Sequence, residues 1–502
     1  MHHHHQSTFM ELGQTNPDFG KWVFLPTVDS YCNSFDHLDQ YKCYGYLSML
    51  AKFIEVTKNM TEAEMKLYLV RAEYRYFHHV AYRYSSPNSV VPLDIAIFMQ
   101  EHKANPYKLE DDTDREFPCP SDLLQINEFD PIVNYHNQNA LPLYWKDKMG
   151  PKEPPHLTKD NILSSSQDGY AELTCIVCYI DLHVKWQDFA EWRLDHKVAL
   201  CCHRCKSQFT MDHVGKANLI IDLYKSTLYR DPQYTRAIIG KTHSKILQYV
   251  KSIHDLKELP FDSGLDAIKD YLVKNQREAG KKDDGSIDDF IEAARNTYFG
   301  GPYICSSSDL IKELAGNYAF HYTVTQELKW TARDFSKMPL DYVHFARLNE
   351  VAAKKPNFIL VPTYKTEIAR RTHLVRTKYF RVKGHKYVDG NIAGVNTVIP
   401  DGQEDKYIQI TKCEWNILRA KRSQHDTKPS VKNTIQKIVL FAKSGRLYDK
   451  YEVNEAYISK PGSAHVVELV KREHASDDLY RQLQGLRKLE VHVSICDIEI
   501  IG

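Results

Sequence analysis

The stretch that decides the fold runs from Thr174 to Ser207 and reads T-C-I-V-C-Y-I-D-L-H-V-K-W-Q-D-F-A-E-W-R-L-D-H-K-V-A-L-C-C-H-R-C-K-S. Two Cys-x-x-Cys pairs frame it, and their members are Cys175, Cys178, Cys202 and Cys205. Two such knuckles can place four thiolates at the corners of a tetrahedron, which is the geometry that zinc prefers. Because four protein ligands leave no open coordination position, the spacing predicts a structural zinc site.

The interval between the knuckles, residues 179–201, is slightly longer than the common range, so we expect it to contain a hairpin. Leu182–Trp186 and Lys197–Leu200 have the strand-like composition to build it. Cys201 is expected to pack and His203 to lie at the surface, although either can substitute as a ligand. Two pairs of reduced thiols, or a redox-active pair without a thioredoxin-like βαβ context, are the alternatives.

Composition describes a globular chain. Its 502 residues correspond to roughly three domains. Lys and Arg (66) almost balance Asp and Glu (65), so no global charge attracts nucleic acid or an anionic membrane. No run approaches the length of a transmembrane helix, and the mean hydropathy is -0.50. The N-terminal histidine run has the form of an expression tag and is not followed by the apolar stretch of a signal peptide.

Eleven cysteines form an odd number spread over a long chain, which favours a reducing compartment. We therefore expect a cytoplasmic protein, with the nucleus as the alternative. The basic clusters are not clean localisation signals, so the sequence leaves this choice open.

Helices are predicted on both sides of the cysteine-rich stretch. Thr61-x-x-Glu64 is a capping box that opens one helix, and a second is expected from Leu93 to about Lys103. Residues 265–279 form the clearest later helix, with Gly280 where a C-terminal glycine belongs. Ser306-x-x-Asp309 predicts another N-terminus, with the serine as the cap.

Two distant segments read alike. Tyr74–Phe77 is followed by a Val-Pro break at Val91 and by a helix that closes on His102. Tyr342–Phe345 is followed by the same break at Val361 and by a helix that closes on His373. Proline resets the backbone before each second helix, because the residue before it avoids the α region. The pattern predicts duplicated helical modules.

These patterns predict an α+β fold, mainly α, with two helical modules, an inserted zinc-ribbon-like β element and a C-terminal β domain. The C-terminal domain is expected because strand-like segments follow one another after residue 438. The predicted divisions are a first module at 20–138, a linker at 139–165, the ribbon at 166–215, a helical connector at 216–300, a second module at 301–400 and the β-rich domain at 401–502.

No catalytic residue is predicted. His102 and His373 are expected to cap or pack helix ends. The residues two positions earlier are Gln100 and Arg371, and a guanidinium cannot ligate a cation. The chain also lacks a phosphate loop, a nucleophile elbow and a His-Glu-x-x-His pair. A degenerate metalloenzyme around His102 and His373 is kept as an alternative.

A basic stretch with interleaved aromatic residues covers 365–386 and contains one carboxylate, Glu367. Cations beside aromatic rings suit phosphates and unstacked bases. The competing interpretation is a solvated helix face that acids elsewhere in the fold balance. The candidate anion or nucleic-acid contacts are Arg370, Arg371, Arg376, Lys378, Arg381 and Lys383.

Several motifs carry a family resemblance. Residues 25–32 read L-P-T-V-D-S-Y-C, residues 71–77 read R-A-E-Y-R-Y-F, and residues 361–363 read V-P-T. Together with the two knuckles, they resemble divergent fungal members of the glycine-rich-domain-protein-like family. The resemblance implies a helical scaffold with a zinc-ribbon-like insert, and no established catalytic activity. The family motif Trp-His-x-His is changed in both copies, to Met99–Gln100 and to Arg370–Arg371, so we expect its histidine site to be lost.

The sequence therefore predicts a non-enzymatic scaffold or protein-interaction protein. Zinc is the expected cofactor, and an unidentified protein is the expected partner, with no membrane involved. Nucleic-acid (RNA) binding through the ribbon and residues 365–386 is the alternative, and it predicts affinity that weakens with rising salt.

Overall fold

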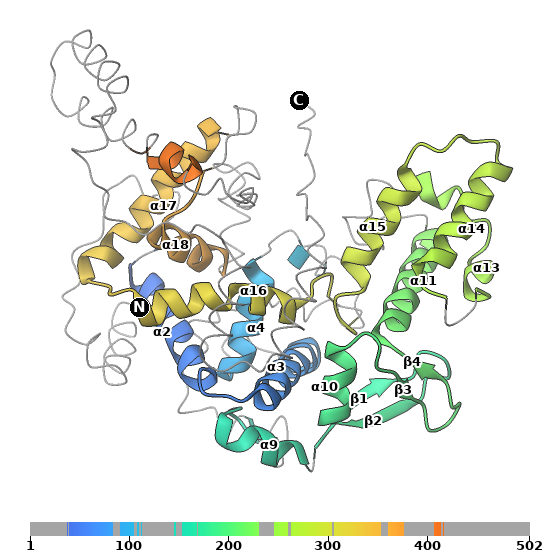
Figure 1. Cartoon of the computed structure of the whole chain (residues 1–502), viewed down its shortest axis with the longest axis horizontal. Coiled ribbons are helices and arrows are strands. Elements are labelled where there is room, and N and C mark those ends of the chain that lie inside the picture. The colour runs from blue at the N-terminus through green and yellow to red at the C-terminus, as the bar shows by residue number, and fades with distance from the viewer. Residues whose placement is uncertain are drawn as a thin grey trace, which may run out of the picture.

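The architecture is mainly helical with two small antiparallel sheets (Figure 1), which confirms the predicted fold class. This computed structural model describes residues 38, 40–83, 91–104, 108–109, 112, 145–146, 153–167, 169–229, 245–259, 263–303, 306–352, 360–375, 406–412 and 415. The strands expected after residue 438 lie outside the described residues, and the described part of the predicted C-terminal domain, residues 406–412 and 415, is helical.

The first helical unit consists of α2 (Gln40–Thr57), α3 (Glu62–Arg83) and α4 (Leu93–Ala104). The predicted capping box is confirmed, since Thr61 N donates to Glu64 Oε2 at 2.6 Å and Glu64 N donates to Thr61 Oγ1 at 3.3 Å. These bonds satisfy amides that the first helical turn leaves without partners. Residues 93–103 of α4 are all buried, so this helix lies inside the unit rather than on its surface.

The second helical unit consists of α16 (Leu310–Tyr322), the π-helical turn η4 (Thr323–Glu327), α17 (Ala332–Ala352) and α18 (Tyr364–Leu374). α16 packs against α2, α3 and α4, while α17 and α18 both contact α2. The two units therefore share one hydrophobic core. The N-terminal cap of α16 is Asp309, whose carboxylate accepts from Lys312 N at 3.1 Å. The prediction that Ser306 caps this helix was wrong, because the Ser306 hydroxyl donates to the Ser308 carbonyl.

A tyrosine–histidine hydrogen bond recurs in the two units. Tyr76 Oη on α3 lies 2.8 Å from His102 Nδ1 near the end of α4. Tyr342 Oη on α17 lies 3.1 Å from His373 Nδ1 near the end of α18. Tyr76 therefore corresponds to Tyr342 in the structure. The sequence motif aligns Tyr74 with Tyr342, so the structural alignment is shifted by two residues. Both histidines are buried.

The cysteine-rich segment forms two hairpins around a helix. β1 (Tyr170–Thr174) pairs with β2 (Asp181–Lys185), and β3 (Leu200–Cys201) pairs with β4 (Gln208–Phe209). The prediction of a hairpin between the knuckles was wrong, because β2 runs directly into α10 (Trp186–Leu194). The helix forms because Trp186, Phe189 and Trp192 repeat on one face and are buried together. α9 (Lys159–Gln167) precedes β1 and packs against α3 and α10.

A second hydrophobic core belongs to the helical connector. It contains α11 (Met211–Tyr229), α13 (Ile253–Lys257), α14 (Leu265–Glu278) and α15 (Ser286–Tyr298). The predicted helix over 265–279 is confirmed, and Gly280 takes the left-handed φ of +69° that ends it. These helices therefore pack mainly on one another.

The motif R-A-E-Y-R-Y-F of α3 holds several segments at once. The Arg71 guanidinium donates to Glu153, Ser165 and Ser166, so it fixes α9 and the chain before it. Arg75 pairs with Asp94 of α4 at 2.9 Å. Phe77 stacks on Tyr303, with ring centroids 4.4 Å apart. The motif is thus a strip of connections between α3 and its neighbours.

The strongest of these connections is the buried fork of Arg193 on α10. Its Nε and Nη2 donate to the two Glu73 carboxylate oxygens, each at 2.8 Å. Nη2 also donates to the Gly300 carbonyl and to Asp309 Oδ1, each at 2.9 Å. A Cβ at residue 300 would lie 2.9 Å from Asp309 N, so the close approach requires glycine. Arg193 thereby ties the ribbon to α3 and to the cap of α16.

Arg193→Ala is expected to destabilise the fold by roughly 3–5 kcal/mol, because it leaves the Glu73 carboxylate buried without a counter-charge. Urea unfolding followed by tryptophan fluorescence measures this loss. Arg277→Ala, which removes an exposed guanidinium from α14, is the control and should change stability by less than about 0.5 kcal/mol. Equal stability of the two variants would contradict the role of Arg193.

Candidate metal centre

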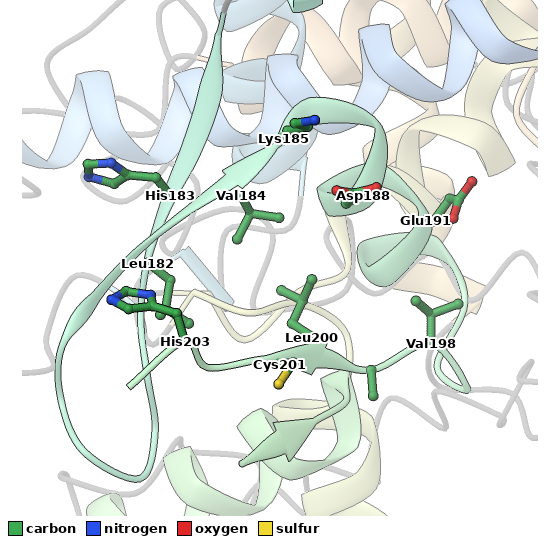
Figure 2. A pocket seen from close by; sticks show the side chains of 11 residues that line it. Leu182, His183, Val184, Lys185, Asp188, Glu191, Val198, Leu200, Cys201 and His203 are labelled. Carbon is green, nitrogen blue, oxygen red and sulfur yellow. The ribbon is translucent and has the colours of Figure 1, made fainter. Parts of the chain in front are cut away.

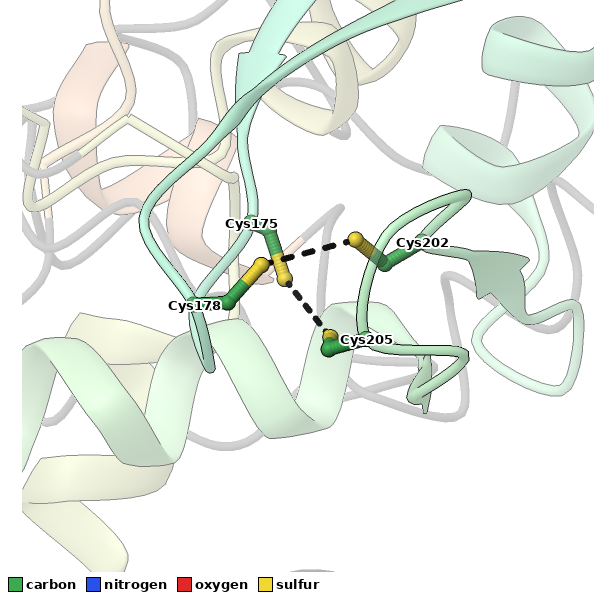
Figure 3. Close-up of side chains that lie close together, drawn as sticks. All are labelled: Cys175, Cys178, Cys202 and Cys205. Atoms are coloured by element: carbon green, nitrogen blue, oxygen red, sulfur yellow. Dashed lines mark hydrogen bonds between the residues drawn. The ribbon is translucent and has the colours of Figure 1, made fainter.

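Four cysteine sulfurs meet between the two hairpins (Figure 3). Cys175 and Cys178 lie in the turn between β1 and β2, and Cys202 and Cys205 lie in the turn between β3 and β4. All four sulfurs lie within 4.8 Å of one another. The Cys175–Cys205 sulfur pair is 3.7 Å apart and the Cys178–Cys202 pair is 3.6 Å apart.

These distances fit a tetrahedral metal site. Four thiolates bound to one zinc ion at about 2.3 Å would have their sulfurs about 3.8 Å apart. None of the four cysteines forms a disulfide. The arrangement can therefore hold a metal ion with all four positions occupied by protein. Zinc is the ion that the sequence predicts, and the geometry does not name the metal.

The two knuckles have the same backbone. Cys175 N donates to Ile180 O at 2.8 Å, and Cys202 N donates to Ser207 O at 2.9 Å. The residue after each second cysteine, Tyr179 or Lys206, adopts a left-handed φ of 58° or 63°. Among the described residues these are the non-glycine positions with positive φ. Such a conformation is strained for a side chain with a Cβ, so strain is concentrated at the sulfur cluster.

Hydrogen bonding favours the thiolate forms of the second knuckle. Cys205 Sγ lies 3.4 Å from Ser207 Oγ, and hydrogen bonds from the Ser207 side chain and backbone lower the pKa of Cys205 to about 6. Backbone amides also lower the pKa of Cys202. In the first knuckle the Ile180 amide lowers the pKa of Cys178, but burial and hydrogen bonds with the other three thiols outweigh it and raise that pKa to about 11. Metal binding requires deprotonated thiols, so loading the site releases protons.

Tyr179→Gly and Lys206→Gly are each expected to stabilise the ribbon by up to about 1 kcal/mol, since glycine adopts a left-handed φ without strain. Both native side chains are exposed, so little packing is lost. Arg204→Gly is the control, because Arg204 is exposed in the same turn without a positive φ and should lose stability. The measurement is the Tm of the metal-loaded chain. A lower Tm for Lys206→Gly than for the parent would contradict the claim that residue 206 is strained.

Cys201 and His203 lie outside the sulfur cluster. Both residues are exposed. No other group of three or more His, Cys, Asp or Glu side chains in the described part of the chain could hold a metal ion. His102 is instead bonded to Tyr76 and, through Nε2, to Asp112 Oδ2 at 3.0 Å.

The two described arginines of the basic stretch make ion pairs inside the fold. Arg370 and Arg371 both donate to Glu367. Arg371 is buried, donates to Asn317 Oδ1 at 2.8 Å and lies 4.5 Å from the centroid of the Phe320 ring. The Arg371 guanidinium therefore stabilises the contact between α18 and α16. Because this contact is buried, a polyanion cannot reach the guanidinium. Arg376, Lys378, Arg381 and Lys383 lie outside the described residues.

A buried polar cluster lies beside Arg371, and the sequence did not predict it. Glu101 of α4 accepts from Asn317 Nδ2 at 2.7 Å, and its other oxygen lies 3.4 Å from His321 Nε2. Burial raises the pKa of Glu101 to about 7 against the opposing charge of Arg371. Burial also holds the pKa of His321 well below its usual value. The available sequence signal was a glutamate shortly after the apolar run at residues 95–99 of α4.

Glu101→Gln should stabilise the protein increasingly as the pH rises from 4.5 to about 7. Glu101 binds its proton more tightly when folded, so its ionisation destabilises the fold over this range by roughly 2–3 kcal/mol in total. The measurement is the difference in unfolding free energy between variant and parent at several pH values, which cancels the opposite contribution of His321. Glu292→Gln, an exposed position on α15, should give a flat difference; a flat difference for Glu101→Gln would contradict the buried acid.

Comparisons with known proteins give no relative: no family model, no curated protein and no solved structure matches this chain. The family resemblance drawn from the motifs therefore stays a prediction. Among the described helices, none is long and apolar enough to cross a membrane.

Proposed function

We propose that this protein is a non-catalytic scaffold whose protein-interaction surface is supported by a structural zinc ribbon. The observation that carries the proposal is the cluster of four cysteine sulfurs within 4.8 Å of one another. A set of four thiolates leaves no position for a substrate or a reactive water, which is typical of structural sites. Tetrahedral sulfur ligation is the chemistry of zinc or of iron–sulfur sites, and the two-knuckle form favours zinc.

The ion would hold together elements that are too small to be stable alone. β3 and β4 have two residues each, and an isolated two-stranded hairpin is marginal in water. Zinc supplies a cross-link between the two hairpins, and its binding energy contributes to folding. α10 then spans the interval and places Arg193 against Glu73. The ribbon is thus attached to the helical core through α10.

The biological setting follows from the same thiols. We place the protein in the cytoplasm, because zinc-binding cysteines stay reduced there. We also retain the proposed relation to the fungal glycine-rich-domain-protein-like proteins, which rests on the motifs at residues 71–77 and on the two knuckles. A partner protein is the proposed ligand of the scaffold.

Elemental analysis tests the zinc site on a chain that begins at Gln6, so that His2–His5 cannot bind metal. We expect about one zinc per chain, lost together with thermal stability in the Cys175→Ser/Cys202→Ser double variant, because two ligands are removed. Cys201→Ser is the matched control, since Cys201 neighbours the cluster without joining it. Zinc retained by the double variant, or iron in its place, would refute the proposed site.

A further inference from the structure

A groove of about 480 Å³ lies between the two hairpins of the ribbon and α10 (Figure 2). Residues 182–185 of β2 form one wall, and residues 198–201, which include β3, form the other. Asp188 and Glu191 of α10 line it at one end. His183 and His203 lie toward the opposite side in this view.

The walls of the groove are the open edges of two strands. Successive side chains of a strand point to opposite faces of its sheet. A hollow lined by four consecutive residues therefore lies along the edge of the strand and not over one face. β2 pairs with β1 on its far side, and β3 pairs with β4. The two sheets remain separate within the described structure. Each wall therefore offers a backbone edge that no described strand covers.

Such an edge is a template for another strand. Edge strands present unpaired N–H and C=O groups, and proteins commonly bind extended peptides by pairing with them. Of the apolar residues that line the walls, Leu182 and Leu200 are buried in the core, while Val184 and Val198 are half-buried and remain accessible from the groove. An extended segment placed here can bond to β2, to β3 or to both, while its side chains reach Val184 and Val198.

The charges in the groove indicate what the segment carries. Asp188 and Glu191 are exposed on one face of α10, three residues apart. Neither makes an ion pair with another described residue. Lys185 is the one lysine or arginine among the residues that line the groove, so the two carboxylates outnumber it. A basic side chain is favoured at this end, and a phosphate backbone is repelled.

We propose that this groove binds an extended segment of a partner protein as an added β-strand, with apolar side chains over Val184 and Val198 and a basic side chain between Asp188 and Glu191. The inference rests on the proposed function for the existence of a partner, and it names the partner's chemistry. The zinc knuckles set the spacing of the two walls, because each wall leaves or enters a knuckle.

The test uses the zinc-loaded full chain and an array of fluorescent peptides of about nine residues, long enough for one strand. Each peptide has alternating threonine and a varied apolar residue, and ends in two arginines, two threonines or two glutamates. Fluorescence anisotropy should show binding of arginine peptides at least about tenfold tighter than their glutamate counterparts. Peptides N-methylated at alternate amides should lose binding, because methylation removes the donors that pair with an edge.

Asp188→Lys/Glu191→Lys should reverse the preference from arginine to glutamate peptides. Asp266→Lys/Asp270→Lys is the matched control, because it makes the same charge change on an exposed face of α14 and should leave binding unchanged. No binding by any peptide, equal binding of N-methylated peptides, or tighter binding of an oligouridine probe would each overturn the inference.

Zinc content and Tm are measured on every variant, which separates the two proposals. Normal zinc content without peptide binding removes the groove inference and leaves the structural zinc proposal intact. Absence of zinc from the parent chain removes the proposed function itself.

Discussion

A single buried guanidinium connects the parts of this structure. Arg193 bonds to both oxygens of Glu73, to the Gly300 carbonyl and to the capping carboxylate Asp309. Burying this charge is unfavourable unless every partner is in place, so the interaction exists only when α10, α3 and the start of α16 are correctly placed together. The sulfur cluster contributes by holding the two hairpins from which α10 extends. The sulfur cluster and the packing of the helical core are thereby linked through one side chain.

The two helical units show how a repeat keeps its framework while its polar positions change. Tyr76–His102 and Tyr342–His373 are retained as buried hydrogen bonds. Arg371, two positions before the second histidine, pairs with Glu367 and lies near Glu101 and His321. These residues place a polar cluster between α4, α16 and α18. Asn317 donates to Glu101 and accepts from Arg371, so these two bonds form together only when α4, α16 and α18 pack in this arrangement.

The sequence predicted the features that depend on neighbours along the chain. The capping box at Thr61, the helix that ends at Gly280 and the grouping of the four cysteines all follow from short spacings. The features that were missed depend on distant partners. α10 replaced a predicted hairpin because its aromatic face packs on Tyr74 of α3, with ring centroids of Tyr74 and Trp186 5.1 Å apart. Arg371 was read as a surface cation because Asn317 and Phe320, which hold it, lie on another helix.

Hydrogen exchange with and without zinc tests the central claim most directly, that the metal site supports the helical core through α10 and Arg193. Removing the ion with a chelator should lower amide protection in β1–β4, in α10 and at the start of α16, while α14 and α15 keep theirs because they pack in a separate core. A loss of protection confined to the two knuckle turns, with α10 and α16 unchanged, would contradict the account.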